Sequence, residues 1–348
     1  MRAGRLIGAV LAALALTACA SVAPAAPKMT ETAPAARSPD MIDLIAYVKA
    51  HASTGFIVIR DGKVLVDEAW PPPTGDAMFA NFVYGTTPDG ALLEDVASQQ
   101  KSFVAILAAI AIDKGLLDIQ APVDRYLGVG WSKAAPEQEA RIRVIDVLNM
   151  SSGLNEQFGY VAPPQTVFFY NTPVYAITKQ IVAAAAGQPL EAITRDWLTV
   201  PAGMKDTAWR QRPAALASVG NATALVTTPH DVVRFGLMVL HDGVAENGTR
   251  VVSAAQLHAL FARASTNPAY GRLWWLNGGE YTLNVGGGRR EGQLIPAAPA
   301  DLVAALGFLD RRLYVVPSRK LVVVRTGAAV NDAQFDNELW LRLMKAIG

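Results

Sequence analysis

Apolar runs at the two ends of the chain predict an antiparallel sheet to which both ends contribute. Four short runs are rich in β-branched and other apolar residues, as expected of strands: 55–59, 64–66, 312–316 and 321–325. The first two runs are joined at Asp61-Gly62, a strong hairpin signal, and the last two by a Pro-Ser-Arg-Lys turn. Helical patterns at about 41–51 and 332–347 predict helices that flank this sheet.

The middle of the chain is mostly helical in pattern. Residues 101–112 are apolar on nearly every side and the run stops near Gly115, a typical helix C-cap, so we expect a buried helix there. We infer a discontinuous α/β architecture of the α+β type. An α/β sandwich domain would come from 40–97 and 266–348, and a mostly helical domain from 98–265.

The first residues have the organisation of an export signal. Arg2 and Arg5 precede a short apolar run, which predicts a signal peptide over 1–18. Its end, Leu-Thr-Ala before Cys19, resembles the lipobox of bacterial lipoproteins, although an ordinary secretory signal is the alternative. An Ala-, Pro- and Thr-rich tether over 19–39 would follow. We therefore expect a lipid anchor at the cell envelope, facing the periplasm. The outer membrane is favoured because no aspartate follows the cysteine.

Composition narrows the possible partners. Of the 348 residues 51% are hydrophobic, the formal net charge is +1, and no cluster of Lys and Arg occurs, which argues against a nucleic-acid partner. Cys19 is the only cysteine, so a disulfide or a cysteine-rich zinc site is excluded. No grouping of His, Asp and Glu has the spacing of metal ligands, and we expect neither metal nor cofactor.

Ser98 and Lys101 are candidates for nucleophilic catalysis. At the start of a helix, residues three apart share a face, so the lysine amine would point at the serine hydroxyl. The base must be a neutral amine, and burial among apolar neighbours lowers the pKa of a lysine towards that state. An N-cap serine followed by an ordinary first-turn lysine explains the same residues. Spacing alone leaves these two interpretations equal.

Tyr170 lies in an aromatic loop that leads into a second helix. A tyrosine close to a lysine ammonium has its phenolate favoured and is able to move a proton. Packing against Phe168 and Phe169 is the simpler interpretation of the same residue, and on this pattern alone we prefer it.

Together these residues resemble the serine β-lactamase and penicillin-binding-protein superfamily, in particular its class C-like esterase and amidase branch. The resemblance extends almost end to end, in order and in spacing. Its segments are 98–103, 114–118, 144–154, 203–207, 228–236, 270–275 and 314–318. It implies an αβα sandwich with an inserted helical domain. It also implies that Ser98 is acylated, that Lys101 is its base or proton relay, and that Tyr170 belongs to the second motif.

Two positions depart from the family pattern. The second motif is usually Tyr-x-Asn, whereas Thr172 stands here in the third place, so a hydroxyl replaces an amide that commonly contacts the substrate. The third motif, usually Lys-Thr-Gly or His-x-Gly, falls at 305–307 and has no cation, although Gly307 is present. The backbone N–H of Phe308 would complete an oxyanion hole with that of Ser98.

These departures leave three hypotheses for function. Without a cation for a substrate carboxylate, a neutral ester or amide is favoured over a β-lactam. Cation-poor relatives include carboxylesterases and 6-aminohexanoate-oligomer hydrolases. Trp275 would line the acyl pocket of this chain, although aromatic pairs on strands are more often part of the core. A penicillin-binding protein, β-lactamase or D,D-peptidase would need Arg289, Arg290 or Arg312 in place of the missing cation. The third hypothesis is a non-catalytic envelope protein that binds a peptidoglycan fragment or a partner.

Overall fold

The computed structural model describes residues 37–348. The expected signal peptide over 1–18, Cys19 with its lipid anchor, and most of the tether lie outside these residues, and they stay predictions together with the envelope location. Within 37–348, no helix combines the length and apolar character that crossing a bilayer requires.

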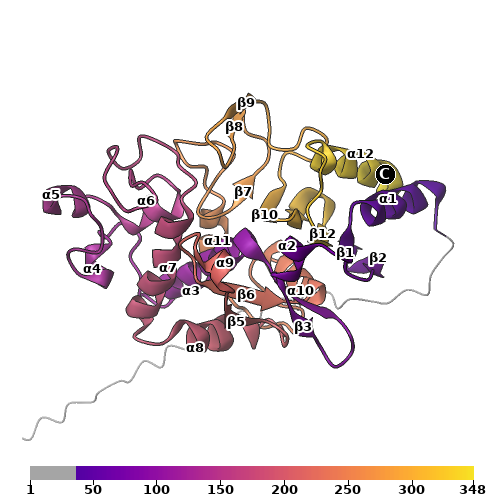
Figure 1. Ribbon diagram of the computed structural model, residues 1–348, viewed down its shortest axis with the longest axis horizontal. Helices are drawn as coiled ribbons and strands as arrows, with labels where there is room; N and C mark the ends of the chain where they lie inside the picture. Colours follow the sequence, from indigo (N-terminus) through magenta and orange to yellow (C-terminus); the bar gives the residue numbers. More distant parts are fainter. Residues whose placement is uncertain (1–36) are drawn as a thin grey trace, which may run out of the picture.

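A six-stranded antiparallel sheet joins the two ends of the chain (Figure 1). Its order is β2-β1-β12-β11-β10-β7. The strands are β1 Ser53–Arg60, β2 Lys63–Ala69, β7 Trp275–Leu276, β10 Val303–Gly307, β11 Arg311–Val316 and β12 Leu321–Gly327. The predicted hairpin at Asp61-Gly62 is confirmed, with positive φ at both turn residues, 50° and 72°. The pairing of β1 with β12, which includes Val58 opposite Val323, confirms that both ends build one sheet.

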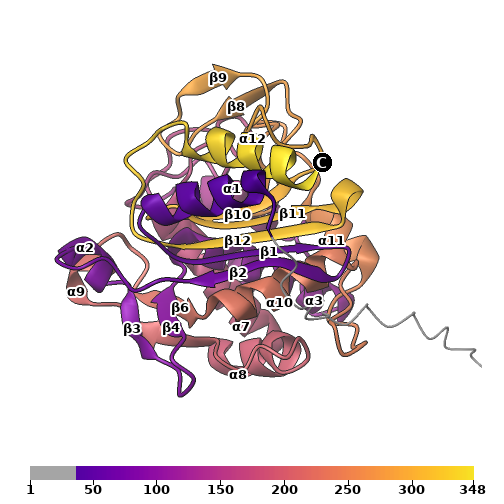
Figure 2. The ribbon, with the colours of Figure 1, turned by 90° about the vertical axis from the view of Figure 1, so that its right-hand side faces the viewer.

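Helices cover both faces of this sheet, which confirms the αβα sandwich. The terminal helices α1 (Pro39–Ala50) and α12 (Phe335–Ile347) contact each other and lie side by side over one face (Figure 2). Each turns an apolar stripe to the sheet; in α1 the buried residues Leu44 and Val48 are four apart. On the other face, α10 (Pro229–Leu240) packs against β11 and β12.

The middle of the chain contains more than helices. The helices there are α3 Gln100–Asp113, α4 Asp124–Leu127, α5 Pro136–Glu139, α6 Val144–Leu148, α7 Thr172–Ala186, α8 Leu190–Thr194, α9 Ala214–Ala217 and α11 Ala254–Leu260, besides α10. Two strands, β5 (Ala208–Gln211) and β6 (Thr223–Thr227), join β3 (Val83–Thr86) and β4 (Leu92–Asp95) in a second sheet of order β3-β4-β6-β5. The segment 98–265 therefore supplies strands to this sheet and α10 to the large one, while the proposed domain boundaries stay a prediction.

The helix α3 lies at the junction of the two parts. Its residues from Gln100 to Ala111 are all buried, which confirms the buried helix expected from its apolar pattern. It contacts α7, α11 and β10, and Phe103 stacks on Phe235 of α10 with ring centroids 3.8 Å apart. The residues just before α3 are consequently held between the large sheet and the helices.

A buried ion pair connects the two sheets beside this junction. Arg311 of β11 donates to Glu94 of β4 at 2.8 Å, and both side chains are at most 1% exposed. The hydroxyl of Thr54, on β1, donates to the same carboxylate. Because a buried charge that loses its partner keeps its full desolvation cost, this pair ties the register of β4 to that of the large sheet.

We expect Glu94→Gln to lower the free energy of unfolding by about 3–5 kcal/mol, because it leaves the Arg311 guanidinium buried without a counterion. Urea unfolding followed by circular dichroism measures this change. Glu291→Gln, which breaks the exposed pair with Arg289, is the matched control and should leave the unfolding midpoint unchanged. An equally small effect of Glu94→Gln would contradict the structural role of the buried pair.

Candidate active site

Ser98 lies in a short turn, the 3-10 helix η1 (Ala97–Gln99), that leads directly into α3. Two hydrogen bonds hold this turn in place. The Ala97 N–H donates to the Asp95 carboxylate at 2.8 Å, and the Gln99 side-chain amide donates to the Ala305 carbonyl of β10 at 3.1 Å. Ala97 has a φ of 50°, an unusual value for a residue other than glycine. The turn therefore holds the serine hydroxyl between the end of β4 and the edge of β10.

The side chain of Lys101 reaches back to this serine. Its Nζ lies 3.0 Å from Ser98 Oγ and 3.3 Å from Thr172 Oγ1. Burial, and to a smaller extent the positive charges of Arg212 and Lys179, lower the pKa of Lys101 to about 7. A substantial fraction of the amine is therefore neutral near pH 7, the form that accepts a proton from the serine. The geometry and charge state fit the base predicted from the spacing.

Tyr170 lies on the other side of the serine, directly before α7. The Tyr170 ring stacks on Trp275 with centroids 5.7 Å apart, and Lys101 Nζ lies 4.7 Å from the centroid of the Tyr170 ring. Burial raises the pKa of Tyr170 to about 12, while a hydrogen bond with Ser98 acts in the lowering direction. This differs from the sequence-based expectation of a favoured phenolate. Burial of the tyrosine disfavours its phenolate, and the neighbouring lysine, which is only partly charged near pH 7, does not offset this, so Tyr170 is a neutral phenol.

The residues that follow Tyr170 have roles that the sequence did not reveal. The Asn171 side chain caps α7 by accepting from the Val174 N–H at 3.1 Å, and it donates to the Leu154 carbonyl. This amide is therefore fully engaged in the fold. Thr172, predicted to contact substrate, lies against Lys101 and also lines the cavity at Ser98. It helps to fix the position of the amine as well as presenting a hydroxyl to the cavity.

The segment 305–307, predicted from the resemblance to be the third motif, lies at the end of β10, with Ala305 in the place of a cation. Gly307 is required there, because a Cβ at this position would lie only 2.5 Å from the Val96 carbonyl oxygen. The close approach of backbone brings the start of the next loop to the serine. Phe308, whose side chain is 58% exposed, lines the cavity there together with Ser98. Its backbone N–H as an oxyanion donor remains a prediction.

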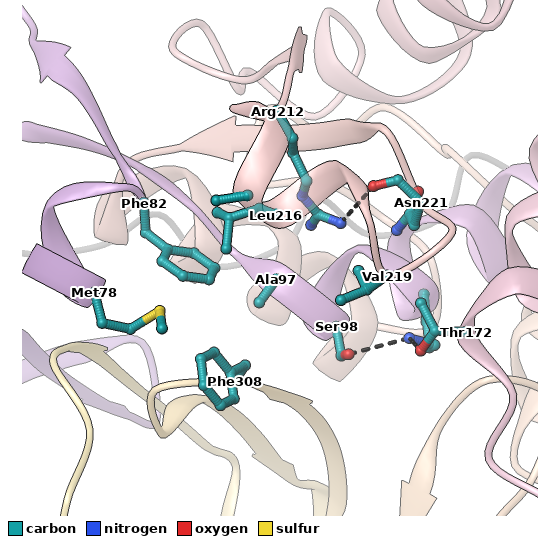
Figure 3. Close-up of a pocket in the computed structure, with 12 residues that line it drawn as sticks. Met78, Phe82, Ala97, Ser98, Thr172, Arg212, Leu216, Val219, Asn221 and Phe308 are labelled. Atoms are coloured by element: carbon teal, nitrogen blue, oxygen red, sulfur yellow. Dashed lines mark hydrogen bonds between the residues drawn. The ribbon is translucent and has the colours of Figure 1, made fainter.

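Two cavities meet at Ser98 and Phe308. The first, of about 350 Å³, is mainly apolar (Figure 3). Its remaining lining residues are Met78, Phe82, Ala97, Lys101, Thr172, Arg212, Ala215, Leu216, Val219 and Asn221. The second, of about 470 Å³, lies on the Tyr170 side and is also lined by Trp275. A substrate whose scissile bond lies at Ser98 would therefore place the group on one side of this bond in each cavity.

The arginines nominated from the sequence as substitutes for the missing cation are not free to take that role. Arg312 lines the second cavity, but it pairs with Asp310 at 2.6 Å and with Asp336 at 2.9 Å. Arg289 and Arg290 are exposed on strand β9 (Arg289–Glu291) and line neither of these two cavities.

Arg212 is the arginine that lines the first cavity, and sequence reasoning missed it. It is buried, and Asp95 accepts two hydrogen bonds from it, at 2.8 and 3.1 Å. A third guanidinium hydrogen bond runs to the Asn221 carbonyl (Figure 3). No local motif surrounds Arg212, and its place next to Ser98 depends on the pairing of β5 with β6 and β6 with β4. The charge of Arg212 is balanced by Asp95 rather than left for a substrate.

Comparison with known proteins agrees with this geometry. A model of the β-lactamase family matches residues 42–342, and the chain belongs to this family, whose members are serine hydrolases. A curated relative, penicillin-binding protein 4 of Amycolatopsis lactamdurans, is 27% identical over 207 residues, which are 45% of this chain and 53% of that protein. The chain thus spans about half the length of the curated relative it matches.

Solved structures share the fold. A Bacillus anthracis protein assigned as a 6-aminohexanoate-dimer hydrolase superimposes with a TM-score of 0.64 at 13% identity, covering 92% of this chain and 89% of its own. A family VIII carboxylesterase superimposes with a TM-score of 0.63 at 14% identity, covering 90% and 98%. At such low identities these structures establish the fold alone.

The pKa of Lys101 leads to a pH prediction. A base with a pKa of about 7 must lose its proton to act, so acylation of Ser98 by a fluorophosphonate should accelerate as the pH rises through 7 and level off above about 8. Mass spectrometry of samples quenched over time gives the rate at each pH. A rate that does not change between pH 5.5 and 9 would contradict the assignment of Lys101 as the base.

Proposed function

We propose that the protein is a serine hydrolase that cleaves a neutral ester or amide with an apolar acyl group through an acyl-enzyme on Ser98. One observation carries this proposal: a buried amine, whose pKa is lowered to about 7, lies 3.0 Å from the serine oxygen at the meeting point of two cavities. A non-catalytic binding protein has no need for a lysine kept neutral at this cost in desolvation.

The mechanism follows from the positions of three side chains. Ser98 Oγ attacks the carbonyl carbon while its proton passes to Lys101 Nζ, and backbone N–H groups of Ser98 and Phe308 hold the oxyanion. As the scissile bond breaks, the Tyr170 hydroxyl donates its proton to the leaving oxygen or nitrogen and is reprotonated from Lys101. Water then attacks the acyl-enzyme, and the same groups return the proton to Ser98.

The two cavities define the two halves of the substrate. Tyr170 lines the second cavity, so the leaving group that it protonates lies there and the acyl group lies in the first. Four exposed apolar side chains surround the openings of these cavities: Met78, Val219, Val285 and Phe308. Since apolar surface of this kind is costly in water, a substrate that covers it gains binding energy. These features support a hydrophobic acyl chain in the first cavity.

The penicillin-binding alternative receives less support. A substrate carboxylate would need an unpaired cation beside the serine. Both arginines that line the cavities at Ser98 already pair with carboxylates, Arg212 with Asp95 and Arg312 with Asp310 and Asp336. The ester or amide hypothesis requires no such cation and therefore fits the charge distribution better.

Intact-protein mass spectrometry distinguishes the three hypotheses. Exposure to a fluorophosphonate and to p-nitrophenyl butyrate should give adducts on Ser98 that are absent from Ser98→Ala, whereas benzylpenicillin should give no lasting adduct and no turnover. A stable penicilloyl adduct or turnover of nitrocefin would instead support the penicillin-binding alternative. Protein that reacts with none of these reagents would point to a binding function.

The location of the acyl chain is tested by narrowing the first cavity. Ala215, on the short helix α9, lines this cavity and is exposed. We expect Ala215→Trp to lower kcat/KM for p-nitrophenyl hexanoate relative to the acetate by about tenfold or more. Ala214→Trp changes the adjacent residue, which lines neither cavity at Ser98, and should leave the ratio unaltered. An unchanged ratio in Ala215→Trp would place the acyl chain elsewhere.

A further inference from the structure

A second buried lysine lies behind the candidate catalytic one. Lys179, on α7, is 6% exposed, and its Nζ donates to Asn221 Oδ1 at 2.5 Å, Thr223 Oγ1 at 2.6 Å and Gln100 Oε1 at 3.2 Å. No ion pair of the described chain, residues 37–348, includes Lys179. A buried ammonium without a carboxylate partner is costly, and the mechanism above does not use it.

Lys179 and Lys101 are connected through one aromatic ring and one amide. The Nζ atoms of Lys101 and Lys179 lie 4.6 and 5.9 Å from the centroid of the Tyr175 ring. The Tyr175 hydroxyl and Lys179 both donate to Gln100 Oε1, each at 3.2 Å. Gln100 directly precedes Lys101 on α3, so the distance between the amines is set by packed side chains, and no mobile loop intervenes.

The hydrogen-bond partners divide the charge between the two lysines. Burial and the charge of Arg212 lower the pKa of Lys179 to about 7. Its hydrogen-bond partners act in the other direction, because the amide oxygens of Asn221 and Gln100 can only accept and therefore favour the ammonium form. The indole ring of Trp209, 5.1 Å from Nζ, adds a cation-π contact that favours the same form. Lys101 faces the hydroxyls of Ser98 and Thr172, which can donate to a neutral amine as readily as they accept from a charged one.

The other charged and titratable groups around the pair do not cancel this charge. Arg212 is a second cation near Lys101. Asp95 is the carboxylate that acts on Lys179, but it accepts a bidentate pair of hydrogen bonds from Arg212. Tyr170 and Tyr175 are buried phenols whose pKa values are raised, so they bring no negative charge. The field of Lys179 therefore acts on Lys101 across the buried ring of Tyr175, where screening by solvent is weak.

We propose that Lys179 is a resident cation whose charge keeps Lys101 in the neutral form that accepts the proton of Ser98. It is a positioning residue, because it touches neither the serine nor the cavity that holds the acyl group. The proposal rests on the function proposed above, in which Lys101 is the base. Protonating Lys101 beside Lys179 would place two like charges against the same ring, and this repulsion opposes the inactive form.

The pH dependence of acylation in Lys179→Met tests the proposal. Without the Lys179 charge, Lys101 binds its proton more tightly, so a larger fraction is protonated and inactive at a given pH. We expect the rate of Ser98 labelling by a fluorophosphonate to fall about fivefold at pH 6.5 relative to the unaltered protein. At pH 9, where Lys101 is neutral in both proteins, the two rates should agree within about twofold.

Two further variants separate charge from structure. Lys179→Arg keeps the positive charge and should retain the midpoint of the pH profile, whereas Lys114→Met removes an exposed lysine from the far end of α3 and should change nothing. A uniform loss of rate in Lys179→Met with an unmoved midpoint would overturn the proposal. If the Met variant does not fold, a midpoint that moves to higher pH in Lys179→Arg would overturn it.

The experiment also separates this proposal from the one on which it rests. Labelling of Ser98 in the unaltered protein, with a rate that rises through pH 7, supports the proposed hydrolase independently of Lys179. An unmoved midpoint in Lys179→Met then removes the role of Lys179 alone. Failure to label Ser98 in the unaltered protein would remove both proposals together.

Discussion

The burial of one amine is the constraint on which the candidate site depends. Lys101 can act on Ser98 only as a free amine, and a lysine in water is almost always charged at neutral pH. The chain meets this requirement by placing Lys101 inside α3, where every residue from Gln100 to Ala111 is buried. The helix is in turn held between the large sheet and the helical part of the chain, so the charge state of one side chain depends on how both parts pack.

Around the site, the buried carboxylates form ion pairs with arginines and not with Lys101 or Lys179. Glu94 pairs with Arg311 and Asp95 with Arg212, both deep in the interior. Arginine is always charged and forms bidentate pairs with carboxylates, so it takes these counterions permanently. Lysine loses its proton more readily when it is buried. This division explains how an interior rich in positive groups can contain an amine with a lowered pKa at Lys101.

The same arrangement accounts for the change in the third motif. In place of a cation, Ala305 contributes only its backbone, which accepts a hydrogen bond from Gln99 and so holds the turn of Ser98. The first cavity is bounded by apolar side chains from α9 and from the segment around Met78. The absence of a cation at Ala305 favours a neutral substrate, and the apolar lining of the first cavity favours a hydrophobic one.

Local features of this protein were determined by the sequence itself. The hairpin at Asp61-Gly62 and the buried helix after Ser98 depend on residues close together in the chain, so turn chemistry and the apolar pattern were enough to predict them. The spacing also placed Lys101 on the same face as Ser98, but only the family resemblance favoured catalysis over an N-cap serine with an ordinary lysine. The tertiary structure decided what depends on distant segments. Examples are the neutral state of Tyr170, the engagement of Thr172 with Lys101, and the approach of Arg212 and Lys179 to the site. Burial and electrostatic fields are sums over whatever surrounds a group, and those neighbours are brought together only when β5, β6 and α7 pack around α3.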